Sequence, residues 1–144
     1  MTELVGGRHY LIDTSVLARH KNPRVHEVVA GLIADRLAAT CATIDLEAGY
    51  SGRDFAEVEA IQLRRRDLYR LLPLTEEAAE RAREVQLRMA KRGHHRAAGV
   101  FDLLSAAAAE LNGAVILHYD HDFEHIAAVT GQPQVWVVPP GSID

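Results

Sequence analysis

Short apolar segments alternate with longer segments of helical periodicity, and this order restricts the fold more than any other feature of the sequence. The spacing predicts buried strands at residues 9–12, 38–43, 114–118 and 134–139, and a shorter strand within 68–75 that Pro73 helps to end. Helical segments separate these strands. Such alternation predicts an α/β fold, in which helices cover both faces of a mostly parallel sheet of about five strands in a three-layer α/β/α arrangement.

The predicted helices carry start and stop signals of their own. Thr43 is a candidate N-cap for the segment 44–51, and Asp13, Thr14 or Ser15 for the helix after the first strand. The segment 76–92 has acids in its first turn and bases in its last, the order that the helix dipole prefers. Gly93 and Gly113 are predicted to end the helices that precede them.

Composition places the chain among globular proteins. Of its 144 residues, 48% are apolar and 25% charged, which predicts one domain over residues 1–144 with a packed core. No apolar run approaches the roughly 20 residues that span a membrane, and the first residues do not resemble a secretory signal. Cys41 is the only cysteine, which suits a reducing cytoplasm, and it is predicted to be buried.

Charge is distributed unevenly along the chain. The net charge is −4, which argues against a simple cationic nucleic-acid binder. Residues 53–96, however, hold 11 Lys and Arg against 8 Asp and Glu, whereas the remaining residues hold 5 basic against 12 acidic ones. The middle of the chain could therefore line an approach for a polyanion, although solvated helix faces account for such charges equally well.

Acidic residues recur at the predicted junctions between strands and helices. In a parallel α/β sheet, the carboxyl ends of strands and the first turns of helices share one edge, where ligands bind. Carboxylates far apart in the sequence can therefore converge there, and we expect this of Asp13, Glu47, Asp102, Asp120 and Asp122. Taken singly, Asp13 and Asp102 could be ordinary helix caps and Glu47 a surface acid.

Gathered carboxylates repel one another unless a cation compensates them. Oxygen ligands suit Mg²⁺ or Mn²⁺ better than zinc, and Thr14 and Ser15 could orient Asp13 or hold a water on the ion. Such a site is suited to hydrolysis of phosphodiesters, because the ion activates water and offsets charge on the leaving oxygen. A phosphatase with an aspartate nucleophile is less consistent, since "DTS" lacks a second acid.

Four segments of the chain resemble, in order, the signature segments of the PIN domain, and more narrowly those of the VapC toxins of bacterial toxin–antitoxin pairs. They are "YLIDTSVL", "TIDLEAGYS", "RGHHRAAGVFDLLSAAAA" and "VILHYDHDFEHIA", and the likeness extends over residues 10–136. The resemblance implies a Mg²⁺- or Mn²⁺-dependent endoribonuclease that cuts tRNA or rRNA. It also implies a cognate VapB-like antitoxin and a homodimer.

The resemblance also implies roles for individual residues. Asp13 and Asp102 would be metal ligands, with Glu47 and Asp120 completing the site and Asp122 in support. His118 stands where the family often has Thr or Ser, and it is the histidine expected nearest the site. His95 and Arg96 match a basic stretch that commonly precedes the third acid.

Several basic residues keep two interpretations. Lys91, Arg92, His95 and Arg96 are candidates for phosphate contacts, because they precede Asp102 in a predicted loop. The arginines at 64–66 indicate a solvated helix face or else an RNA or antitoxin contact, and His121 with His125 could share a helix face as zinc ligands. An alternative to the enzyme is a protein-binding module whose acids capture a basic segment of the antitoxin.

Overall fold

The computed structural model describes residues 8–144, and in this part of the chain five strands form one sheet. The strands are β1 (Tyr10–Ile12), β2 (Ala38–Thr40), β3 (Arg70–Leu71), β4 (Val115–His118) and β5 (Gln134–Trp136). The helices are α1 (Thr14–Leu17), α2 (Pro23–Ala34), α3 (Ala42–Tyr50), α4 (Phe55–Leu68), α5 (Glu76–Lys91), α6 (Val100–Leu111) and α7 (Asp122–Thr130). The predicted alternation of strands and helices is therefore confirmed.

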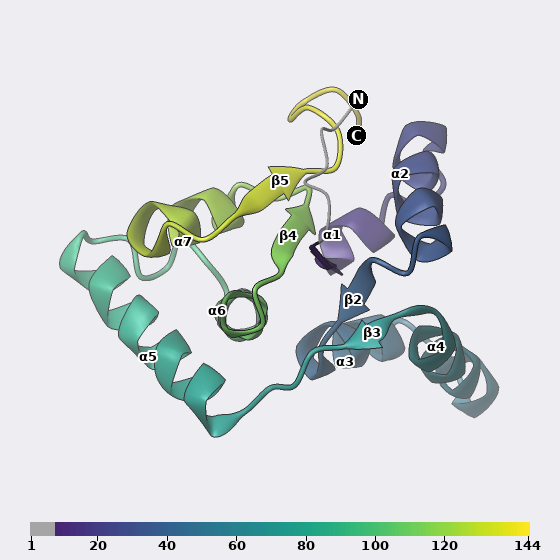
Figure 1. Cartoon of the computed structure of the whole chain (residues 1–144), viewed down its shortest axis with the longest axis horizontal. Coiled ribbons are helices and arrows are strands. Elements are labelled where there is room, and N and C mark those ends of the chain that lie inside the picture. Colours follow the sequence, from purple (N-terminus) through teal and green to yellow (C-terminus); the bar gives the residue numbers. More distant parts are fainter. Residues whose placement is uncertain (1–7) are drawn as a thin grey trace.

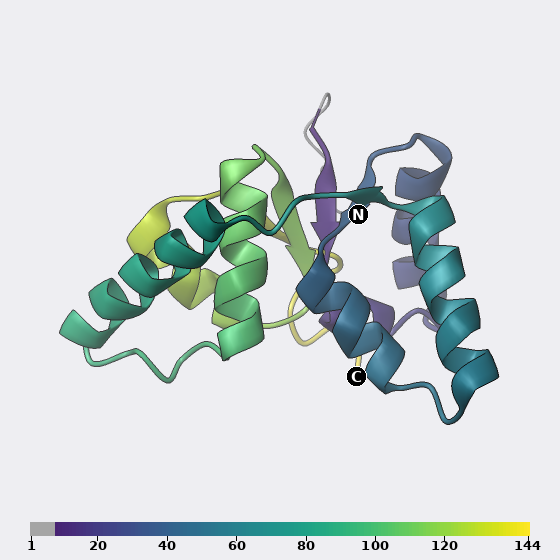
Figure 2. The ribbon, with the colours of Figure 1, turned by 90° about the horizontal axis from the view of Figure 1, so that it is seen from below.

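The strand order is β3-β2-β1-β4-β5, and every neighbouring pair is parallel. The chain builds outwards from β1 through β2 to β3 and then returns to place β4 on the other side of β1. This reversal makes the gap between β1 and β4 the switch point of the sheet, where ligands of open α/β folds bind. Figure 2 shows the arrowheads of β1 and β4 pointing to the edge at which α6 begins.

Alternate residues of the strands pack on opposite faces of the sheet. Leu11 and Ile116 join the core beneath α3, α5, α6 and α7, whereas Tyr10, Ile12 and Leu117 join the core beneath α1 and α2. Figure 1 shows α5, α6 and α7 together on one side of the strands and α2 on the other. These two cores give the three layers α/β/α that the sequence predicts.

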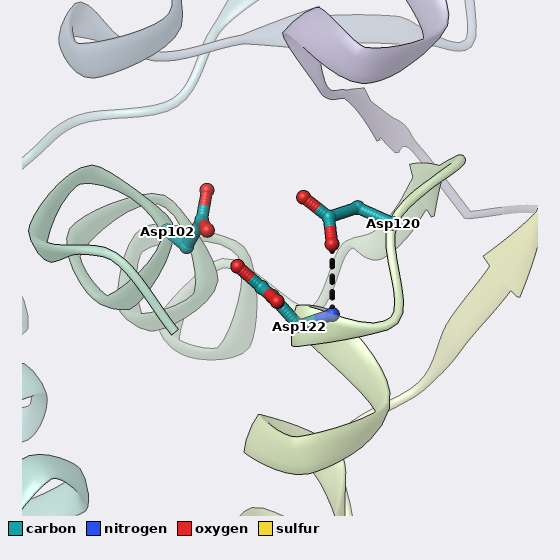
Figure 3. A group of neighbouring side chains, drawn as sticks. All are labelled: Asp102, Asp120 and Asp122. Carbon is teal, nitrogen blue, oxygen red and sulfur yellow. Dashed lines mark hydrogen bonds between the residues drawn. The ribbon is translucent and has the colours of Figure 1, made fainter. Parts of the chain in front are cut away.

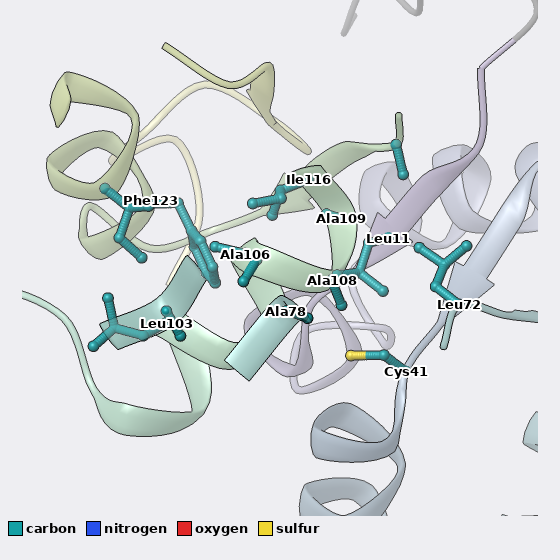
Figure 4. Packing of buried hydrophobic residues seen from close by; sticks show 14 of the residues in the cluster. Leu11, Cys41, Leu72, Ala78, Leu103, Ala106, Ala108, Ala109, Ile116 and Phe123 are labelled. Atoms are coloured by element: carbon teal, nitrogen blue, oxygen red, sulfur yellow. The ribbon is translucent and has the colours of Figure 1, made fainter. Parts of the chain in front are cut away.

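The first core is built around α6 (Figure 4), whose residues Ala106–Ala109 are all buried. Their small side chains allow the helix to approach the strands closely, and larger residues such as Leu103, Phe123 and Ile116 fill the space around it. Cys41 lies in the same core, as predicted. Close packing holds α6 firmly, and this helix carries Asp102 in its first turn.

Some local predictions were wrong. The second strand ends at Thr40 rather than at residue 43, and Cys41 is the N-cap of α3, so Thr43 is not a cap. Thr43 lies inside the helix and is buried, and its hydroxyl is near that of Ser105. Arg65 does not belong to a solvated face, because only 5% of it is exposed.

Other end signals are confirmed. Asp13 caps α1, as predicted, through a side-chain oxygen that accepts a backbone N–H bond, and Thr75 caps α5 in the same way. Gly93 and Gly113 follow their helices with φ of 73° and 66°, a left-handed conformation that glycine adopts without strain. In residues 8–144, no helix is long and apolar enough to cross a bilayer.

Candidate metal centre

Asp13 lies at the carboxyl end of β1, beside β4. Its backbone N–H donates to Leu117 O at 3.0 Å, which continues the pairing of the two strands past the end of β1. The carboxylate is buried, and its Oδ2 accepts a bond from Ser15 N at 3.0 Å. Among the described residues Oδ1 has no hydrogen-bond partner, although it is shielded from water. An unpaired buried oxygen is costly, so Asp13 Oδ1 is suited to a ligand that residues 8–144 do not provide.

Three further acids meet beside Asp13. Asp102 comes from the first turn of α6, Asp120 from the loop after β4, and Asp122 from the start of α7. One oxygen from each lies within 4.8 Å of the others. Figure 3 shows the three side chains gathered at this point. Asp122 N donates to Asp120 Oδ1 at 2.9 Å, which fixes the turn that brings the two aspartates together. The structure therefore gathers three of the predicted carboxylates within reach of one ion.

Glu47 approaches the same edge from α3 and is partly exposed. Burial raises the pKa of Glu47, the charge of Asp13 raises it further, and a hydrogen bond from the Thr14 side chain opposes this rise. Glu47 therefore belongs electrostatically to the group around Asp13, although it lies outside the trio of aspartates. The Thr14 side chain thus contacts Glu47, whereas Ser15 contacts Asp13 through its backbone N–H.

The electrostatics of these carboxylates show that they are crowded. Burial raises the pKa of Asp102 to about 7, with contributions from the charge of Asp13 and a hydrogen bond with Asp122. Burial also raises the pKa values of Asp13 and Asp122, and in both cases the charge of Asp120 adds to the effect. Each shift shows that the folded chain disfavours the full set of negative charges.

The described residues compensate these charges little: the charge of His125 lowers the pKa of Asp122, but burial and the charge of Asp120 outweigh it. None of the five carboxylates forms an ion pair with a lysine or arginine within residues 8–144. The donors are all oxygens, two carboxylates lie at helix starts, and Asp13 Oδ1 lacks a partner. This donor set fits a hard divalent cation such as Mg²⁺ or Mn²⁺ better than zinc, which prefers nitrogen and sulfur.

His118 is the last residue of β4, and the loop that carries Asp120 follows it directly. It is fully buried, and burial lowers its pKa. Its Nδ1 is 3.1 Å from Asp120 N, so the ring contacts the backbone of the site rather than its carboxylates. Ser15 has a similar position, because its hydroxyl accepts a bond from Tyr119 N at 2.9 Å and ties α1 to the same loop.

The basic residues before α6 are exposed. Lys91 ends α5, and Arg92, His95 and Arg96 follow in the loop that leads to Asp102. Arg92 Nη1 donates to Ala128 O at 3.3 Å near the end of α7, so this side chain already has a structural contact. Their exposure leaves them accessible to a polyanion approaching the acids.

The other histidines do not assemble a zinc site. His121 lies 2.8 Å from Glu124, and the His125 ring lies edge-on to that of His94. In the described part of the chain, the one group of three or more ligands brought together is the aspartate trio.

Two buried contacts near the site were missed by sequence reasoning. Arg65 Nε donates to Asp45 Oδ1 at 2.6 Å and joins α4 to α3, and Arg65 also bonds to Thr40. Thr43 and Ser105 share a hydrogen bond between α3 and α6. Thr43 lies one turn before Glu47, and Ser105 lies one turn after Asp102. Residues at this i, i+3 or i, i+4 spacing share a helix face, so the sequence could have suggested that Thr43 and Ser105 lie near the two acids.

A cavity of about 390 Å³ lies against a different part of α3. Asp45 and Arg65 are its charged residues together with Arg66, and Leu46, Tyr69 and Leu71 give it apolar walls. The five acids do not line it, so this cavity and the candidate metal centre are separate features.

Comparisons with known proteins agree with this geometry. The family model described as "PIN domain" matches residues 10–129. Ribonuclease VapC51 of Mycobacterium tuberculosis (strain ATCC 25618 / H37Rv) is 42% identical over 135 residues, which are 94% of this chain and 97% of that protein. Ribonuclease VapC21 of Mycobacterium tuberculosis (strain CDC 1551 / Oshkosh) is 38% identical over 133 residues, which are 92% of this chain and 96% of that protein.

Solved structures show the same fold at low identity. A chain in the structure of DNA-bound VapBC from Salmonella typhimurium has a TM-score of 0.72 and 16% identity, covering 91% of this chain and 99% of that one. A chain in the structure of VapBC2 from Rickettsia felis, bound to a DNA fragment from their promoter, has a TM-score of 0.71 and 13% identity, covering 88% of this chain and 97% of that one. At such identities, these likenesses support the fold alone.

Proposed function

Because the chain belongs to the PIN domain family and, within it, to the VapC ribonucleases, we propose that it is the toxin of a type II toxin–antitoxin system. Its activity is that of an endoribonuclease that hydrolyses RNA phosphodiester bonds with Mg²⁺ or Mn²⁺. The observation that carries this proposal is the group of carboxylates at the β1–β4 edge, which the described residues leave without a cation.

The five acids have different proposed roles in binding the ion. Asp13 and Asp102 are the proposed direct ligands, with Glu47 and Asp120 completing the set and Asp122 supporting it. The ion, when bound, lowers the pKa of water and offsets charge on the phosphate. Asp13 is held ready by Ser15 N, and Asp120 by its bond from Asp122 N, so both reach their positions before an ion arrives. We expect no covalent enzyme intermediate.

RNA would reach the acids past the exposed loop before α6. Lys91, Arg92, His95 and Arg96 lie within or next to this loop, and phosphate contacts there would position the strand without reading its sequence. We propose tRNA or rRNA as the substrate class, because folded RNAs present loops whose unstacked bases a protein can bind.

The proposed regulator is a cognate VapB-like antitoxin. The names of the solved relatives pair VapB with VapC, which supports such a partner. We further propose that the chain acts in the cytoplasm as one domain over residues 1–144 and as a homodimer.

The central experiment maps RNA 5′ ends after brief expression of the wild type and of Asp13→Asn. New ends at defined positions are expected for the wild type and not for Asp13→Asn, because an amide is a weaker ligand than a carboxylate. Glu59→Gln is the matched control, since it removes an exposed acid on α4 that is not one of the five carboxylates. Full cleavage by purified Asp13→Asn, unaffected by EDTA, would reject the metal-dependent mechanism.

The alternative is a protein-binding module of weak activity, whose acidic pocket captures a basic antitoxin segment. The same uncompensated carboxylates favour it, because an inserted arginine would neutralise them as an ion does. Titration with Mn²⁺ and labelled RNA in the absence of antitoxin separates the two functions. Turnover of a defined RNA supports the enzyme, whereas tight binding of a basic peptide without turnover supports the module.

A further inference from the structure

His118 is the last residue of β4 and the most enclosed polar side chain near the acids. It has no exposed surface, and its ring packs against those of Phe123 and Trp136 with centroids 5.1 and 4.9 Å away. These two ring contacts restrict the rotation of the imidazole. A buried imidazole that cannot turn presents its two nitrogens in fixed directions.

Each ring nitrogen of His118 has a different partner. Nδ1 lies 3.1 Å from Asp120 N, and Nε2 is hydrogen-bonded with Gln134 Oε1. A backbone N–H can only donate, so Nδ1 must carry the lone pair and accept. The proton of the neutral ring is then on Nε2, where the Gln134 carbonyl oxygen accepts it. Gln134, at the start of β5, therefore selects the tautomer that Asp120 requires.

The bond from His118 is the first of two that shape the loop between β4 and α7. Asp120 N donates to His118 Nδ1, and Asp122 N donates to Asp120 Oδ1, so each bond spans two residues. The first bond fixes the backbone of Asp120, and the second aligns Asp120 with Asp122. Without the first bond, Asp120 could move away from Asp102, and the group of three aspartates shown in Figure 3 would lose one carboxylate.

We propose that His118, held as its Nε2–H tautomer by Gln134, is a positioning residue that sets Asp120 and Asp122 for binding of the divalent cation. This inference rests on the proposed function, since the cation is its ligand. His118 acts through the backbone of Asp120 and neither binds the ion nor transfers a proton. Its role is that of an outer residue which orients a ligand, and loss of such residues typically costs 10–100-fold in metal affinity.

The test compares His118→Asn with His118→Leu. The two replacements have nearly the same shape, and both lose the ring contacts with Phe123 and Trp136. Asn retains an oxygen at the place of Nδ1 that can accept from Asp120 N, whereas Leu retains no acceptor. Any difference between the variants therefore reports the hydrogen bond and not the packing.

Two measurements are made on each folded variant. Calorimetric titration with Mn²⁺ should show affinity within about 3-fold of the wild type for His118→Asn, and a loss of roughly 10–100-fold for His118→Leu. Hydrogen exchange in the metal-free protein should show the Asp120 amide protected in the wild type and in His118→Asn but not in His118→Leu. Equal Mn²⁺ affinity and equal Asp120 protection in both variants would overturn the inference.

Gln134→Leu provides a second test if His118→Leu does not fold. The ring remains, but the Nε2–H loses its acceptor, so both tautomers become accessible and protection of the Asp120 amide should fall. Unchanged protection and unchanged Mn²⁺ affinity would overturn the inference. A wild type that binds no Mn²⁺ would end the metal-site proposal, yet amide exchange would still decide whether His118 positions Asp120.

Discussion

Asp45 and Glu47 are two residues apart in α3, and their carboxylates have different electrostatic environments. Asp45 faces α4, where Arg65 donates to it at 2.6 Å, and the arginine also bonds to Thr40. Glu47 faces the β1–β4 edge, where its neighbours are other acids and its pKa is raised by burial and by Asp13. The same residue class in one helix is thus neutralised on one side and left uncompensated on the other.

The comparison separates a structural carboxylate from a candidate functional one. Arg65 forms an ion pair with Asp45. In residues 8–144, no lysine or arginine forms one with Glu47, Asp13 or Asp102. Because residues 8–144 place no lysine or arginine there, an ion or a partner's side chain is the countercharge that we expect at this edge. Substitutions on the two sides of α3 should therefore have different effects on stability and on metal binding.

The largest effect is expected for Asp102→Asn. Removal of one charge from the crowded group should raise the unfolding midpoint, because it relieves repulsion from Asp13. RNA cleavage should nevertheless fall by at least about 100-fold, since loss of a ligand should exceed the cost of losing a residue that merely orients one. Initial cleavage rates and thermal melts of the same sample would check this pair of changes. Lower stability together with wild-type cleavage would show that Asp102 is a structural carboxylate and not a functional one.

The opposite result is expected on the other side of α3. Arg65→Met leaves Asp45 and Thr40 without their partner and should lower the free energy of unfolding by about 3 kcal/mol, as for other partly buried pairs. Mn²⁺ affinity should change little, because Arg65 does not contact the candidate metal centre. Urea denaturation and calorimetry would measure both quantities. A loss of Mn²⁺ binding as large as that of Asp102→Asn would show that the two sides are not independent.

A pH effect should appear on the acidic side alone. The pKa of Asp102 is about 7 in the folded chain and near its ordinary value when unfolded, so the folded state binds more protons between these values. Stability of the metal-free protein should therefore fall as pH rises from about 4 to about 7. We expect a fall on the order of 2 kcal/mol, about half of what the full difference between the two pKa values would give, because solvent screens the partly exposed Asp102. Thermal melts across this range, with and without Mn²⁺, provide the measurement. Saturating Mn²⁺ should remove most of the fall, and the Asp102→Asn variant should show a smaller one.

The smallest effect concerns the contact that joins α3 to α6. Thr43→Val and Ser105→Ala each remove one hydroxyl of a buried hydrogen bond and should cost about 1 kcal/mol of stability. The double variant should cost less than the sum of the two, because both single changes break the same bond. Additive costs in denaturant titrations would show that the hydroxyls contribute separately.

Local pattern was sufficient to predict most elements of the fold. The alternation of short apolar segments with helices predicted the parallel sheet, and Asp13, Gly93 and Gly113 marked helix ends because capping depends on a few adjacent residues. Where a prediction failed, a distant contact had intervened. Thr43 resembles a cap in sequence, yet its hydroxyl bonds to that of Ser105. The arginines at 64–66 resemble a solvated helix face, yet Arg65 is buried and bonds to Asp45.

For the candidate site, the sequence by itself determined which acids stand at the strand–helix junctions, since that placement follows from the order of elements along the chain. Only the tertiary structure decided that Asp102, Asp120 and Asp122 meet, that Asp13 Oδ1 is left unpaired, and that His118 supports the loop. The physical reason is range: capping and periodicity act over one or two turns, whereas convergence and desolvation depend on strands brought together from 100 residues apart, as when Tyr119 N reaches Ser15 Oγ across 104 positions.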